Sequence, residues 1–127
     1  MARKMLGVAP SGTTDAATVA FVDGRSRYNA ITARTANFTP ALTNEGGLQN
    51  ITASTAITVT LPSNATVAFA IGTRLDFLRA GTGTVTFAAG SGSTVTATPS
   101  LTLRAQWSAC TAVKTATNAW VVIGDMT

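Results

Sequence analysis

Few side chains in this sequence could carry out chemistry, and their types limit what that chemistry could be. The 127 residues contain no histidine and a single cysteine, Cys110. Histidine is the usual general base near neutral pH and the commonest metal ligand, so Ser-His-Asp, Cys-His and structural zinc arrangements cannot form within the chain. Cys110 lies between Trp107 and Val113. We expect it to be a small buried apolar residue rather than a nucleophile.

Carboxylates are the remaining candidate acids and bases. A glycosidase needs two of them facing each other at a defined separation. Asp76 falls in an expected strand near Arg74, where a cross-strand ion pair is the usual arrangement, and Glu45 and Asp125 stand beside glycines in expected turns. We therefore predict that the protein is not an enzyme and needs no cofactor or metal. The carboxylates are Asp15, Asp23, Glu45, Asp76 and Asp125.

The two tryptophans, Trp107 and Trp120, are the candidates for binding a sugar ring, because stacking on carbohydrate needs an exposed aromatic side chain. Trp120 lies in an apolar stretch and is expected in the core. Trp107 ends an alternating stretch, which leaves its exposure open. We favour the core for both, and Trp107 is the residue that would contact a ligand if it were exposed.

Charge is scarce in this chain, at 11% of residues against about 25% in ordinary soluble domains. Solubility depends on interspersed surface charge. We therefore expect much of the surface to be covered in use, by sister subunits or by a larger scaffold. A monomer coated with threonine is the alternative.

The net charge of +4 is spread thinly along the chain. No basic cluster is combined with aromatic residues as in single-strand binders, so no nucleic-acid partner is predicted. A basic N-terminal arm is the more specific interpretation, and such an arm suits an acidic protein lattice. The five basic residues before position 35 are Arg3, Lys4, Arg25, Arg27 and Arg34.

No apolar stretch approaches the roughly 18 residues of a membrane helix, so no membrane partner is expected. Pro10, Ser11 and Gly12 follow the basic start before any adequate apolar region, and we read no signal peptide. Synthesis in a cytoplasm is therefore expected.

The elements that would position these residues divide near Pro40 into an arm, 1–39, and a β-domain, 40–127. The arm holds one short helix candidate, 14–24, with a capping residue at its start and Gly24 at its end. In the β-domain, Ile57, Val59 and Leu61 alternate with threonines, as in a sheet with one buried face. Further strands are expected over 48–52, 67–71, 73–79, 84–88, 95–97, 101–103 and 119–123.

Tight turns join these stretches, and the β-branched residues favour strands. We predict an all-β fold, a β-sandwich of the jelly-roll type, with about seven or eight antiparallel strands.

Two groups of residues resemble parts of bacteriophage virion proteins. The stretch 15–23, DAATVAFVD, resembles the D-A-A-T-K-x-Y-V-D segment of tail-fibre and related virion proteins, with Val19 and Phe21 in place of lysine and tyrosine. The β-domain is similar to one in phage fibre, head-fibre and decoration proteins. Its matching stretches are TVTLP at 58–62, IG at 71–72, GTGTV at 81–85 and WVVIGD at 120–125.

The resemblance implies a rigid, trimeric β-domain on the particle surface, attached by an N-terminal segment, and it brings no catalytic residues. We expect a structural virion protein of the capsid-decoration or head-fibre type, bound to the major capsid protein or another virion protein. Its arm would make polar contacts through the five basic residues and an apolar contact through Phe21 and Val22. The alternative is a tail-fibre or lectin-like module that recognises a glycan or protein on the host surface.

Overall fold

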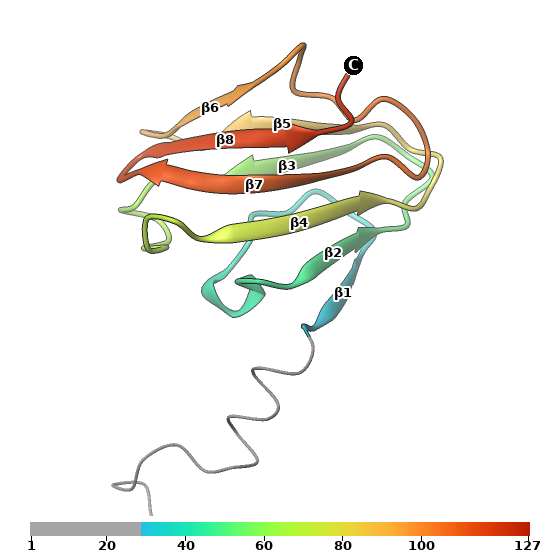
Figure 1. Cartoon of the computed structure of the whole chain (residues 1–127). Coiled ribbons are helices and arrows are strands. Elements are labelled where there is room, and N and C mark those ends of the chain that lie inside the picture. Colours follow the sequence, from blue (N-terminus) through green and yellow to red (C-terminus); the bar gives the residue numbers. More distant parts are fainter. Residues whose placement is uncertain (1–28) are drawn as a thin grey trace, which may run out of the picture.

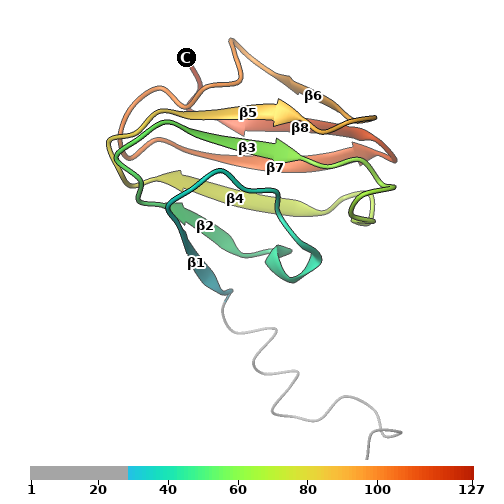
Figure 2. The same cartoon turned by 180° about the vertical axis from the view of Figure 1, so that it is seen from behind.

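The computed structural model describes residues 29–127, and these residues form two stacked β-sheets (Figures 1 and 2). The all-β prediction is confirmed for this part of the chain. No helix in it is long and apolar enough to cross a membrane. One sheet has six strands in the spatial order β1 (Ile31–Arg34), β2 (Leu48–Ile51), β4 (Arg74–Arg79), β7 (Ala109–Ala116), β8 (Ala119–Gly124) and β6 (Thr94–Ala97). The other pairs β3 (Ile57–Leu61) with β5 (Val85–Ala89), and a single 3-10 turn, η1, spans Leu42–Asn44.

The chain winds between the two sheets, so that β2, β3, β4, β5 and β6 lie alternately in the larger and the smaller one. Strands one winding apart therefore become neighbours that run in the same direction. Four of the six strand pairings are parallel: β1 with β2, β2 with β4, β3 with β5, and β6 with β8. Only β4 with β7 and β7 with β8 are antiparallel.

The prediction of antiparallel strands was therefore wrong for most of the sheet. Alternation of apolar residues tells which side of a strand is buried, but it carries no information on strand direction. Parallel neighbours need a long crossover connection. The crossover from β2 to β4 contains β3, and the crossover from β3 to β5 contains β4, so each of these two holds a strand of the opposite sheet.

Successive windings touch through their backbones at one end of the fold. The Gly83 amide donates a hydrogen bond to the Ala53 carbonyl, at 3.0 Å. A Cβ added at Gly83 would lie 1.9 Å from the Thr55 carbonyl oxygen, and one at Gly81 would lie 2.1 Å from the Ala53 carbonyl oxygen. Glycine is required at both positions because a side chain would enter the neighbouring turn.

The core lies between the sheets and contains edge-to-face aromatic pairs. Phe77 and Phe87 are 5.0 Å apart between ring centroids, and Phe69 and Trp120 are 5.4 Å apart. Such pairs add about 0.5–1.5 kcal/mol each beyond their burial. The inward positions expected from the alternation at Ile57, Val59 and Leu61 are confirmed as buried, and the buried side chains that pack with them include Leu75, Phe77, Val85 and Phe87.

A buried lysine fastens the long connection between β3 and β4. Lys114 is 1% exposed, and its Nζ donates to the Phe69 carbonyl at 2.7 Å and to Asn64 Oδ1 at 3.1 Å. Trp120 Nε1 donates to the Pro62 carbonyl at 2.9 Å. This connection is irregular over 67–71, so the strand expected there was wrong. Its backbone groups bond to side chains and turns instead of to a neighbouring strand.

Two further differences concern strands. The stretch 101–103 forms isolated bridges rather than a strand, although Leu103 is fully buried. The longest strand, β7, was not singled out from the sequence, because alanine, threonine and lysine fill most of its positions.

The expected arm is part of the fold from residue 29 onward. Strand β1 pairs with β2, and Phe38 forms a bridge with Val59 of β3. The helix candidate at 14–24 lies outside the described residues.

Candidate functional site

The six-stranded sheet has one side that faces away from β3 and β5, and we call this side the outer face. Its side chains are those that alternate with the buried ones. Six of them are large and aliphatic: Ile31, Leu48, Leu78, Val113, Val121 and Ile123. Ile31 is 69% exposed and Ile123 is 59% exposed. Large aliphatic side chains thus project to solvent from four adjacent strands and from β1 at the sheet edge.

Shallow, open depressions lie on both sides of Ile123. Leu48, Asp76 and Thr111 line the first together with Ile123. Thr96 and Val121 line the second, again with Ile123. The outer face therefore has a projecting aliphatic side chain beside hollows that can receive one, which is the shape of a contact surface rather than of an enclosed pocket.

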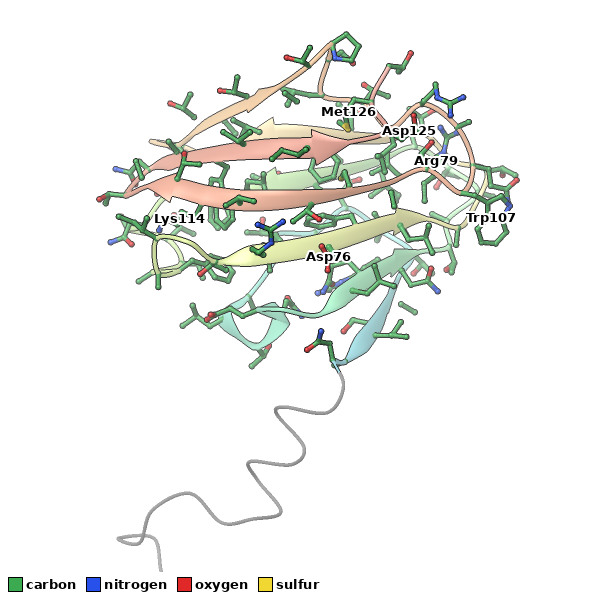
Figure 3. All side chains as sticks on the ribbon, in the orientation of Figure 1. Asp76, Arg79, Trp107, Lys114, Asp125 and Met126 are labelled. Atoms are coloured by element: carbon green, nitrogen blue, oxygen red, sulfur yellow. The ribbon has the colours of Figure 1, made fainter. Side chains whose placement is uncertain are left out.

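Only two charged side chains of the described residues project from the outer face, Arg74 and Asp76, both on β4. Figure 3 shows Asp76 over β4 on this side of the sheet. Thr111 Oγ1 on β7 donates to Asp76 Oδ1 at 2.6 Å. The ion pair expected between Arg74 and Asp76 is not formed. The two stand at successive outward positions of one strand instead of facing each other across two strands.

The 104–108 loop lies at one end of the fold. An ion pair and side-chain hydrogen bonds near the surface hold this loop in place. Arg104 forms a two-bond ion pair with Asp125, both distances being 2.8 Å. Ser108 Oγ donates to the same carboxylate at 2.7 Å and accepts from the Ala105 amide. The hydrogen bond from Arg104, reinforced by that from Ser108, lowers the pKa of Asp125, and the pKa of Arg104 is raised in return.

Trp107 projects from this loop, at the right-hand end of Figure 3. It is 66% exposed, whereas Trp120 is fully buried. The expectation of a core position is thus confirmed for Trp120 and was wrong for Trp107. The 104–108 turn interrupts the alternation that precedes it. The alternation of inward and outward side chains along a strand therefore does not predict the orientation of Trp107.

The backbone of Trp107 is unusual. Its φ is +74°, and it is the only residue other than glycine with positive φ in the described part of the chain. Its amide donates to the Arg79 carbonyl at 2.6 Å. A left-handed conformation costs an aromatic residue about 1–2 kcal/mol. The left-handed backbone of Trp107, which holds its indole in this exposed position, therefore lowers the stability of the folded protein.

Of the residues expected to contact a partner through the arm, the described part of the chain contains Arg34. It lies on β1, where Nε donates to Gln49 Oε1 at 2.8 Å and Nη2 donates to Asn44 Oδ1 at 3.1 Å. Its guanidinium carbon lies 4.2 Å from the centre of the Phe38 ring. Arg34 thus joins the edge of the larger sheet to the η1 region. Arg3, Lys4, Phe21, Val22, Arg25 and Arg27 lie outside the described residues.

The single thiol of the chain, on Cys110, lies in an unreactive setting. Cys110 is buried, as expected, and burial together with the nearby Asp76 charge raises the pKa of its thiol to about 12. Such a thiol is almost entirely protonated at neutral pH. No group of three or more side chains suited to hold a metal ion occurs within residues 29–127.

Sequence reasoning did not identify the outer face, because its members come from strands far apart in the chain. The signal was present in β8, where Val121 and Ile123 alternate with Trp120 and Val122. Apolar residues on both sides of a strand indicate two covered faces.

Comparison with known proteins gave no match. No protein-family model, no curated protein and no solved structure matches this chain.

Proposed function

We propose that this chain is a non-enzymatic structural module that assembles through the outer face of its six-stranded sheet, as a decoration or head-fibre protein of a bacteriophage particle. The observation that supports this most strongly is the set of six large aliphatic side chains on the outer face, accompanied by only two charges among the described residues. A sheet face with several outward aliphatic side chains and few charges is a mark of an interaction site. The low charge content of 11% and the resemblance to phage fibre and decoration proteins also support this proposal.

The energy available from the outer face is of the right order for association. Full burial of a large aliphatic side chain contributes about 1.5–3 kcal/mol. The six are already partly covered, so about half of that contribution, roughly 4.5–9 kcal/mol in total, remains for a partner to supply. Association costs ~4–15 kcal/mol in lost freedom. Hydrophobic contact alone is therefore marginal, and the fit of the remaining groups decides whether a complex forms.

The partners follow from this assignment. Sister subunits cover part of the surface. The resemblance implies a trimer, whereas the charge pattern of the outer face fits a two-fold pair. The N-terminal segment, with Arg3, Lys4, Phe21, Val22, Arg25 and Arg27, binds the major capsid protein or another virion protein. The two facing sheets are best described as a small β-sandwich whose strands wind from one sheet to the other, rather than as a jelly roll.

Two exposed isoleucines provide a test with a matched control. Ile123, at 59% exposure, is on the outer face, and Ile71, at 63% exposure, is in the connection before β4. Sedimentation velocity at micromolar concentration should show that Ile123→Asp shifts the chain toward monomer, while Ile71→Asp leaves its association unchanged. Equal behaviour of the two variants would show that the outer face is not the assembly surface.

The location on a virion needs a separate test. In cells that produce the chain from its natural gene, it should copurify with particles through a density gradient. A chain found wholly in the particle-free fractions contradicts the virion assignment and leaves the assembly surface untouched.

A receptor-binding module is the second candidate function, and the exposure and strained backbone of Trp107 favour it. Since Trp107 and Trp120 are the two tryptophans and Trp120 is buried, quenching of indole fluorescence reports on Trp107. Titration with methyl glycosides of glucose, galactose and N-acetylglucosamine should change the indole fluorescence and reduce its quenching by acrylamide. Titrations in which neither quantity changes count against a sugar site at Trp107.

A further inference from the structure

The two charged side chains of the outer face make this surface complementary to itself. We propose that the occupant of the outer face is a second copy of this chain, related by a two-fold axis, with Arg74 of each copy against Asp76 of the other. This inference rests on the proposed assembly through the outer face and adds the identity of the partner and the geometry of the contact.

The register of the strands supplies the geometry. Asp76, Thr111 and Ile123 lie at one level across β4, β7 and β8. Arg74, Val113 and Val121 lie together at the next outward level. The inward row between these two outward rows contains Leu75, Ala112 and Val122.

A two-fold axis placed between two copies, at right angles to the strands and at the level of Leu75, exchanges the two outward rows. Asp76 of one copy then faces Arg74 of the other, and Ile123 faces Val121. Thr111 faces Val113, whose methyl groups pack against the threonine methyl. Packed sheets lie about 10 Å apart, with their side chains interdigitated. Within these two rows of β4, β7 and β8, opposite charges therefore face each other and no charge faces an apolar side chain.

Both charged groups keep bonding capacity for this contact. Asp76 Oδ1 accepts from Thr111, and Oδ2 has no hydrogen-bond partner among residues 29–127. The Arg74 side chain is exposed and forms no ion pair with another described residue. An arginine presents a planar set of donors that fits a carboxylate. A pair formed between copies would thus add a directed contact to the marginal hydrophobic one.

The balance of charge favours a second copy over a different protein. The chain carries +4 in total, but the outer face carries one positive and one negative side chain among the described residues. A surface suited to an acidic lattice would be basic, whereas a two-fold contact requires a surface that complements itself.

Charge reversal at the two positions gives a specific test. In the Arg74→Glu variant, the introduced carboxylate would meet Asp76 of the second copy, and in the Asp76→Lys variant, the introduced ammonium would meet Arg74. Each variant alone should therefore dimerise on the order of a hundredfold more weakly than the wild type. In a 1:1 mixture both contacts are attractive again, so native mass spectrometry should show a mixed dimer in place of either homodimer. The double variant Arg74→Glu/Asp76→Lys should dimerise like the wild type.

The remaining outcomes separate this inference from the proposed function. Single variants that associate as strongly as the wild type, or a mixture that stays dissociated while the wild type assembles, overturn the Arg74–Asp76 contact and leave the assembly surface standing. A closed ring of three copies cannot alternate two variants, so a wild-type trimer without rescue in the mixture overturns the two-fold geometry. A wild type that remains monomeric at millimolar concentration overturns both proposals.

Discussion

The winding of the chain predicts that two glycines will respond very differently to the same change. In Gly83→Ala the added methyl group would lie 1.9 Å from the Thr55 carbonyl oxygen. In Gly72→Ala it would have nothing within 4 Å, although Gly72 has a φ of +95°. The first substitution therefore tests steric contact between windings, and the second tests backbone conformation alone. Both substitutions lower the conformational entropy of the unfolded chain by the same amount, so this contribution cancels when the two free energies of unfolding are compared.

The cost of each change follows from the geometry. Carbon and oxygen atoms approach to about 3.3 Å in close contacts, so the turns at Gly83 and Thr55 must separate by roughly 1.4 Å. That movement weakens the hydrogen bonds from Gly83 to Ala53, at 3.0 Å, and from Ile57 to Thr84, at 2.8 Å. Two hydrogen bonds at about 1 kcal/mol each and overpacking at about 1–3 kcal/mol give about 3–5 kcal/mol for Gly83→Ala. The left-handed backbone costs about 1–2 kcal/mol in Gly72→Ala.

Urea denaturation followed by circular dichroism measures both free energies of unfolding. Ordinary domains have about 5–15 kcal/mol of stability, so both variants should still show a folding transition. If Gly83→Ala loses no more stability than Gly72→Ala, the close backbone contact between successive windings is refuted.

Three further predictions concern the loop end and the buried thiol. Trp107→Gly should keep or raise the melting temperature, because glycine accepts the positive φ and the exposed indole contributes little burial; a clear loss of stability would show that Trp107 packs against the fold. The pKa of Asp125 is lowered in the folded state, so its contact with Arg104 stabilises the protein above the normal carboxyl pKa of 3.8 and is lost as the pH falls through the lower folded value. The melting temperature of Asp125→Asn should therefore lie below that of the wild type at pH 6 and approach it near pH 2.5, and a constant difference would contradict the ion-pair explanation. Cys110, with a pKa of about 12 and a buried side chain, should react with an aromatic disulfide reagent at pH 8 only in urea, whereas rapid reaction of the folded protein would show that the thiol is accessible.

The contrast between Trp107 and Trp120 shows how far local patterns extend. Trp120 lies inside a run of alternating residues, and a strand repeats the same orientation at every second position. Its burial could be predicted for that reason. Trp107 lies within the turn that precedes β7, outside any run of alternating residues. No spacing rule carries the orientation across such a turn.

Lys114 illustrates a second limit. A lysine in a sequence is normally assigned to the surface. Here its amine is buried because the connection after β3 brings the Phe69 carbonyl and Asn64 Oδ1 to it. These acceptors lie 45 and 50 residues away in the chain. Only the folded path of the connection brings them to the lysine.

The sequence by itself determined which side of most strands is buried, as for Val59, Phe77 and Phe87, because side-chain alternation is a local property of an extended backbone. The tertiary structure alone decided the neighbours and directions of the strands, since these depend on how each turn leads the chain from one sheet to the other. It also placed Arg74 and Asp76 in adjacent rows with Val121 and Ile123 on a single face. That surface is assembled from strands distant in the chain, and long-range pairing, rather than any local pattern, determines its composition.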